Sequence, residues 1–290
     1  MPSLKEIRGR IGSVRNIAQI TRAMEMMSAS RMKRAQDAIL AARPYADELR
    51  DALARVTAVI GEEVDPLLAR RPMRRVGLIV MTSDRGLAGA LDSNTVRAAL
   101  RYISELEGSP EVEVITIGRK GRDQIRRSGV PIAAHFTRFG DRPTFGDVTP
   151  VARLVTNDFL AGTYDEISVV YPGFISTLSQ QPTVTRLLPV PRPEELGAEE
   201  AARTDEYLIE PSPAVVLSRL LPHYVAVDLY RAVLEANASE QSARMIAMRN
   251  ATDNANELIG DLTLVYNKTR QATITREMIE IASGAEALGG

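Results

Sequence analysis

The sequence contains no cysteine and no tryptophan, and only 4% of its residues are aromatic. Without cysteine the chain can form no disulfide, use no thiolate nucleophile and bind no metal through sulfur. Its two histidines, His135 and His223, are far apart in sequence and lack the spacing of a zinc-binding HExxH motif. Both are expected to be ordinary surface or packed side chains, and we predict no metal site and no cofactor.

Long apolar runs are also lacking. No stretch approaches the ~18 apolar residues of a membrane-spanning helix, and the opening MPSLKEIRGRIGSVRN has no apolar signal core. No direct membrane insertion is therefore expected. The chain is expected to stay in the cytosol, or in a compartment that is reached without a cleaved leader.

A large charge of either sign is missing as well. The 36 basic and 37 acidic residues leave a net charge of −1, which argues against a dedicated nucleic-acid binder, although charge can be concentrated locally. With 290 residues, 44% of them hydrophobic, the chain is long enough for one large domain or two modest ones.

The N-terminal segment has the periodicity of a long helix. Apolar residues recur at steps of three and four over residues 4–27. Residues 1–70 are therefore predicted to carry one long helix, with a kink or restart at Pro44. Gly9 and Gly12 each cost a helix about 1 kcal/mol relative to alanine, which suggests that a neighbour approaches the backbone closely there.

The C-terminal segment matches it. Ser212 is a good N-cap and Pro213 suits the first helical position, so residues 212–290 are predicted to form a second long helix, with Pro222 making its first part uncertain. Two such helices at opposite ends of the chain predict a long antiparallel coiled coil. Its heptads drift, so the pairing should be irregular.

The middle of the chain has a different pattern. Short apolar runs alternate with helical ones, which predicts a small, largely parallel, Rossmann-like α/β domain at residues 74–190. The predicted strands are 74–83, 111–118, 130–136 and 164–172, and the predicted helices are 93–106, 121–128 and 150–162. The Pro- and Glu-rich stretch 191–211 is predicted to be a surface linker.

An α/β domain invites a nucleotide-binding interpretation, which the motifs do not favour. Gly86 and Gly89 form G-x-x-G rather than G-x-G-x-x-G, and no Gly-Lys pair occurs in the chain, so a P-loop is impossible. The stretch GRKG at 118–121 resembles the clamp of an RNA-binding KH domain, but four residues match by chance. Tight turns are the simpler interpretation of both, and the chain is predicted not to be a catalyst.

One helical stretch has an unusual surface. In TRAMEMMSASRMKRAQ, residues 21–36, four methionines fall on nearly every side of the helix at about 100° per residue. Residues 1–36 also hold eight basic side chains against two acidic ones. An ordinary amphipathic helix has one apolar face, whereas flexible methionines on all sides suit a helix that packs against changing neighbours.

Two terminal segments carry a resemblance to a known family. IRGRIGSVRNIAQITRAMEMMSASRMKRAQ (7–36) and ARMIAMRNATDNANELIGDLTLVYNKTRQATITREMIEIASGAEAL (243–288) closely resemble the ends of the γ-subunit family of F-type ATP synthases. The likeness continues at residues 81–91 and in SQQPTVTRLLP at 179–189. The cysteine pair of the chloroplast branch of the family is absent.

The resemblance implies a non-catalytic rotor, the central stalk that couples ion flow through the c-ring to ATP synthesis. The two helices would form a shaft inside a ring of α and β subunits, and the α/β domain would lie near the ε subunit and the c-ring. The family further implies one copy per complex, no nucleic acid, and a peripheral position on the cytoplasmic face of the bacterial inner membrane.

The resemblance also implies interface residues. Positions that match those contacting the acidic and catch loops of the β subunits are Met24, Arg31, Lys33, Arg34, Arg244, Arg270 and Gln271.

If the lower ends of the two helices align, the last helix should extend past the first by about 19 residues, or near 28 Å. Residues after Lys268 should then form a lone helix that meets an apolar collar.

Two other functions stay open on the residues alone. A nucleotide- or RNA-binding α/β protein with coiled-coil arms would show ligand affinity in isolation. A passive coiled-coil scaffold would associate with itself without another partner.

Overall fold

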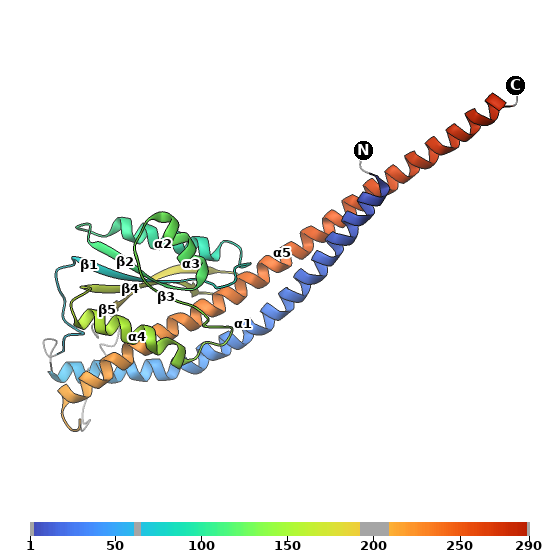
Figure 1. Ribbon diagram of the computed structural model, residues 1–290. Coiled ribbons are helices and arrows are strands. Elements are labelled where there is room, and N and C mark those ends of the chain that lie inside the picture. Colours follow the sequence, from blue (N-terminus) through green and yellow to red (C-terminus); the bar gives the residue numbers. More distant parts are fainter. Residues whose placement is uncertain (1–2, 61–64, 192–208, 289–290) are drawn as a thin grey trace. The chain divides into compact units, whose positions relative to one another are not determined.

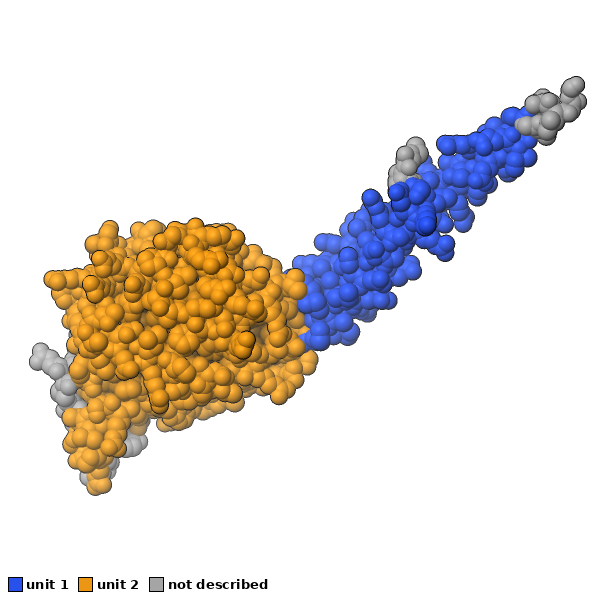
Figure 2. All heavy atoms as spheres, in the orientation of Figure 1, with its two compact units in different colours: residues 1–27, 245–290 blue, residues 28–244 orange. Residues whose placement is uncertain are grey.

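The computed structural model describes residues 3–60, 65–191 and 209–288. The chain divides into a two-helix unit, residues 1–27 with 245–290, and an α/β unit, residues 28–244 (Figures 1 and 2). Most of the predicted linker 191–211 lies outside the described residues.

The two terminal helices are as long as the sequence predicted. Helix α1 (Leu4–Ile60) has 57 residues and helix α5 (Pro213–Leu288) has 76, and each contributes to both units. Of the two alternatives for Pro44, a kink or a restart, the restart is wrong, because α1 continues through this residue, as α5 does through Pro222. A long helix tolerates one missing backbone hydrogen bond where the remaining ones hold its ends.

The α/β unit is built on a five-stranded sheet in the order β3-β2-β1-β4-β5. Strands β1 (Arg75–Met81), β2 (Glu111–Ile117), β3 (Ile132–Phe136) and β4 (Glu166–Phe174) are parallel. Strand β5 (Gln180–Leu188) pairs antiparallel with β4 and was not predicted. Its sequence QQPTVTRLL is polar and contains Pro182, which suits an edge strand and hides the usual strand signal.

Helices cover both faces of the sheet (Figure 1). Helices α2 (Leu91–Glu105) and α3 (Arg119–Ser128) lie on one face, and α4 (Phe145–Leu160) with the first part of α5 lies on the other. Side chains of β1 alternate between the two cores: Leu78 packs with the first pair of helices and Ile79 with the second. Both faces are therefore buried, as the continuous apolar strands required.

Helix α4 begins five residues earlier than the sequence suggested. Thr144 and Asp147 form a capping box, so Pro150 lies inside the helix near its start rather than at its first position. The Asp147 carboxylate accepts hydrogen bonds from the backbone N–H and the hydroxyl of Thr144, at 2.7 and 2.6 Å.

In the two-helix unit, α1 and α5 run antiparallel. The hydroxyls of Thr21 and Thr252 are hydrogen-bonded at 2.7 Å, and Arg249 donates to Glu25 at 2.9 Å, so rising numbers on one helix meet falling numbers on the other. Gly9 and Gly12 do not mark a close approach within the chain, contrary to our expectation. A Cβ atom added at either would meet nothing within 4 Å.

Candidate partner interface

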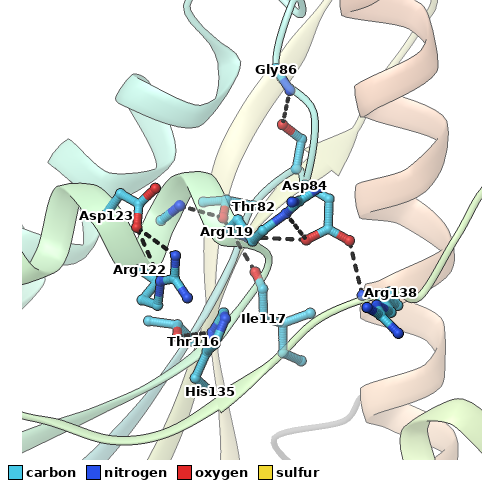
Figure 3. A network of polar contacts seen from close by, with 12 residues as sticks. Thr82, Asp84, Gly86, Thr116, Ile117, Arg119, Arg122, Asp123, His135 and Arg138 are labelled. Carbon is cyan, nitrogen blue, oxygen red and sulfur yellow. Dashed lines mark hydrogen bonds and ion pairs between the residues drawn. The ribbon is translucent and has the colours of Figure 1, made fainter.

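The carboxyl edge of the parallel sheet is where an α/β protein would hold a nucleotide. Here the N-terminal amides of α3 are already occupied. Arg119 N–H donates to the Asp84 carboxylate at 3.1 Å, Lys120 N–H to the Ser83 carbonyl at 3.1 Å, and Gly121 N–H to the Thr82 hydroxyl at 2.7 Å. Figure 3 shows part of this network. The N-terminus of α3 is therefore filled by the loop after β1 and has no free amide among these three to bind a phosphate.

The two glycines of GRKG, Gly118 and Gly121, are explained by the same contact between α3 and the loop after β1. A Cβ at Gly118 would lie 2.0 Å from the Thr82 carbonyl oxygen, and one at Gly121 would lie 2.6 Å from the Thr82 hydroxyl. Gly118 also has a φ of 96°, which favours glycine. Both glycines are therefore required by the close approach of the β1–α2 loop to α3, so they give no support to an RNA clamp.

Little space remains beyond the strand ends. A cavity of about 50 Å³ is lined there by Met81, Ile117 and Pro172 on the sheet side and by Asn237 and Glu240 of α5. Ligand pockets typically measure roughly 300–1,000 Å³. Helix α5 thus occupies the crevice in which a doubly wound protein would bind its cofactor.

Asp84 organises the loops of this edge. Its carboxylate accepts the N–H groups of both Arg119 and Arg138, the latter at 2.9 Å, and lies 3.7 Å from the Arg119 guanidinium (Figure 3). Nearby, His135 Nδ1 is 2.9 Å from the Thr116 hydroxyl, and burial lowers the pKa of this histidine. Across the described part of the chain, no group of acidic and histidine side chains could hold a metal ion.

The basic residues predicted on α1 have different surroundings. Arg31 forms an ion pair with Asp141 at 3.1 Å, and Lys33 pairs with Asp37 one turn along at 2.9 Å. Arg34 is exposed, and no ion pair to it is found within the residues that the structure describes. Of the three, Arg34 offers the most available charge to a partner.

Arg244 lies inside the α/β unit. Its side chain is only 6% exposed, donates Nε and Nη2 to the Gly86 carbonyl at 3.2 and 3.0 Å, and pairs with Glu240. Gln241 accepts a further hydrogen bond from Nη1 at 3.3 Å. The geometry makes Arg244 a tie between α5 and the β1–α2 loop. The spacing of Glu240 and Arg244, four residues apart on one helix, was the sequence signal for the ion pair between them.

The predicted residues of the two-helix unit are more accessible. Met24 is half-buried, while Met26 and Met27 are 62% and 50% exposed. Arg270 and Gln271 are both exposed on α5. Extending the register set by Thr21 and Thr252 puts the start of α1 near Thr269, so these two residues lie where the helix pairing ends.

Beyond that point α5 continues alone (Figure 1). Ile274, Met278 and Ile281 are 46%, 61% and 73% exposed, which confirms the lone helix. The side chain of Leu288, at the end of α5, lies outside the described ones. No described helix combines the length and apolar character needed to cross a membrane.

Comparisons with known proteins agree along the whole chain. A family model described as ATP synthase matches residues 3–288. The ATP synthase gamma chain of Roseiflexus castenholzii is 55% identical over 291 residues, and that of Chloroflexus aurantiacus is 49% identical over 292, each alignment covering 99% of both chains. A chain of the Euglena gracilis mitochondrial ATP synthase, solved with OSCP, F1 and c-ring, superposes with a TM-score of 0.67 at 19% identity, covering 98% of this chain and 94% of that one.

An α/β unit combined with an antiparallel pair of unequal helices is the fold shared with solved structures of ATP synthase central stalks and rotors. The chain belongs to the ATP synthase family, and within it to the gamma chains.

Proposed function

We propose that this chain is the rotor of an F-type ATP synthase and performs no chemistry of its own. The observation that carries the proposal comes from the two-helix unit, in which α5 extends beyond the end of α1. The extension exposes apolar side chains that are not covered by any of the described residues. Exposed methionines and isoleucines on several sides of one helix are explained by a partner that encloses the helix.

Rotation inside a ring explains the choice of residues. Met26 and Met27 are adjacent in sequence, so they point about 100° apart, and both are at least half exposed. A shaft that turns meets each wall of its sleeve in succession, and thioether side chains can repack against surfaces that differ. The angle of the shaft would then determine which nucleotide site of the ring is open.

The proposed coupling contacts are of two kinds, ion pairs made by basic side chains and packing contacts made by uncharged ones. Lys33, Arg34 and Arg270 would face carboxylates of the β-subunit loops, with Met24 and Gln271 packing beside them. Arg31 would reach a loop only by sharing or leaving Asp141. Arg244 would act through the β1–α2 loop, because its guanidinium is buried.

The partners follow from this arrangement. We propose α and β subunits around the two-helix unit, with the ε subunit and the c-ring at the α/β unit, and one copy of the chain per complex. The complex would place the chain on the cytoplasmic face of the bacterial inner membrane, held there by its partners. The geometry of the carboxyl edge, with occupied amides and a 50 Å³ cavity, gives no support to a nucleotide- or RNA-binding alternative.

Reconstitution tests the proposal. The purified chain is combined with α and β subunits, and a bead or fluorophore attached to it is followed while the ring hydrolyses ATP. We expect a 1:3:3 assembly and unidirectional rotation, the ratio following from one shaft in a ring of three α–β pairs. Assembly without rotation of the attached probe would show that the chain is a static scaffold.

A further inference from the structure

The hairpin turn between β4 and β5 carries two of the most exposed large apolar side chains in the described chain. Ile175 is 61% exposed and Leu178 is 81% exposed, on a turn that contains only three further residues between the last residue of β4 and the first of β5. Exposed apolar residues that occur singly need no explanation, whereas two on one tight turn form a small apolar knob.

The turn is held rigid by its own hydrogen bonds. The N–H groups of Ile175 and Ser176 both donate to the Ser179 carbonyl, at 3.3 and 3.0 Å, and Ser179 N–H donates back to Ser176. The Gln180 amide closes the turn with bonds to the Ser176 and Thr177 carbonyls, at 3.1 and 2.9 Å. A contact made by such a preorganised turn loses little conformational entropy on binding.

The knob lies on the carboxyl edge of the sheet, at the end of β4. The β1–α2 loop, which follows the neighbouring strand, adds Leu87, 58% exposed, and Arg85, whose side chain is 67% exposed and lies 3.8 Å from the Asp141 carboxylate. Apolar side chains beside an arginine have the composition that is enriched at the centre of protein interfaces.

The path of the chain indicates which partner this edge meets. The α/β unit ends at residues 28 and 244, and both ends of it are tied to the carboxyl edge. Arg31 pairs with Asp141 in the loop after β3, and Arg244 binds the Gly86 carbonyl in the loop after β1. From these two positions the chain continues into the segments that, in the proposed function, the catalytic ring encloses.

We propose that the apolar knob, Ile175 and Leu178, docks on the rim of the catalytic ring, in an apolar depression bordered by carboxylates that pair with Arg85. The inference depends on the proposed function. It adds a contact outside the two long helices, so that the β4–β5 turn as well as these helices contacts the ring as the rotor turns.

Photo-crosslinking identifies the partner directly. A photo-crosslinking residue, p-benzoylphenylalanine, replaces Leu178 in the assembled complex, which is then irradiated. We expect an adduct with an α or β subunit. An adduct with the ε subunit or the c-ring, or no adduct at all, would overturn the proposal.

Affinity provides the second test. The double variant Ile175→Ser with Leu178→Ser should bind the α/β ring at least about tenfold more weakly than wild type, as expected when a central apolar contact is lost. Leu160→Ser is the matched control, because Leu160 is 46% exposed at the opposite edge, at the end of α4. Equal affinity of the double variant and wild type would overturn the proposal, whereas failure of wild type itself to assemble would count against the proposed function.

Discussion

At the scale of single residues, Arg244 connects two segments that are 158 positions apart. Its fork satisfies the Gly86 carbonyl and the Glu240 carboxylate together, which a lysine ammonium cannot do with the same geometry. Ser83 holds the other side of the loop, since its hydroxyl accepts the Gly86 N–H at 3.0 Å and donates to Asp92 at 2.7 Å. The loop is thus fixed from both α2 and α5.

Replacing Arg244 should therefore destabilise the fold itself. We expect Arg244→Gln to lower the free energy of unfolding by about 2–3 kcal/mol, because it leaves a largely buried carboxylate and a carbonyl without their donor. Arg244→Lys should lose less, since it keeps the charge. Urea unfolding followed by circular dichroism measures both. Wild-type stability of the glutamine variant would mean that the side chain is free to face a partner.

Glu240 gives this tie a pH dependence. Burial raises the pKa of its carboxyl, opposed by Arg244, and the nearby carboxylates of Asp92 and Asp141 raise it further. In the pH range just above the ordinary value of 4.5 the folded chain then binds more protons than the unfolded chain. The contribution of Glu240 to stability is complete below that value and is lost as the pH rises through the raised pKa.

We expect Glu240→Gln to remove this component of the pH dependence. Urea midpoints of wild type and variant, measured between about pH 4 and pH 7, would show wild type losing stability relative to the variant as pH rises. Parallel curves would contradict the assignment.

At the scale of elements, the basic stretch of α1 combines two kinds of residue. Lys33 and Arg34 project from the helix, with side chains that the fold hardly uses, whereas Arg31 is shared with Asp141. Spacing along the helix could not distinguish them, because Asp141 comes from a loop more than a hundred residues away.

The double variant Lys33→Glu with Arg34→Glu separates coupling from folding. Glutamate is also a good helix former, and the lost Lys33–Asp37 pair is worth only ~0.3–0.5 kcal/mol. We expect normal helical content by circular dichroism but poor coupling of ATP hydrolysis to proton pumping in reconstituted membranes. Adding Arg31→Glu should also weaken the fold, because it sets two carboxylates together.

Wild-type pumping by the double variant would show that these residues form a solvated basic face.

The lone end of α5 offers a second test at this scale. Replacing Ile274, Met278 and Ile281 with serine should leave the unfolding of the isolated chain almost unchanged, because all three are exposed. It should weaken retention of the chain in the ring if an apolar collar surrounds them. Size-exclusion chromatography of the assembled complex measures this, with Glu280→Ser as the control. Destabilisation of the isolated chain would indicate an internal partner instead.

At the scale of the whole molecule, the proposed function assigns chemistry and rotation to different chains. The carboxyl edge of the sheet is filled by α5 and by the loop after β1, so no room for a nucleotide remains there. ATP binding to the ring would then move this chain only through the surfaces at which the ring contacts it.

Calorimetry tests that separation. We expect the isolated chain to show no micromolar binding of Mg-ATP, because the N-terminal amides of α3 already have acceptors and the cavity beyond the strand ends measures only about 50 Å³. The assembled ring provides the positive control under the same conditions. Micromolar binding to the chain alone would contradict a rotor without a nucleotide site.

The sequence by itself determined the features that depend on local periodicity. Helical spacing predicted α1 and α5 with their lengths, and apolar runs predicted β1 to β4, because both signals lie within short windows of the chain. The long motifs at the two ends were specific enough to indicate the gamma-chain family.

Only the tertiary structure decided which charged and small residues serve the fold. Gly118 and Gly121 make room for Thr82, Arg31 pairs with Asp141, and Arg244 holds Gly86, each across a long stretch of sequence. Edge strand β5 also depends on its neighbour, since pairing with β4 orders a segment whose first residues are polar and which contains Pro182. Such pairings are set by where the sheet and the long helices bring distant segments together, and no local pattern records that.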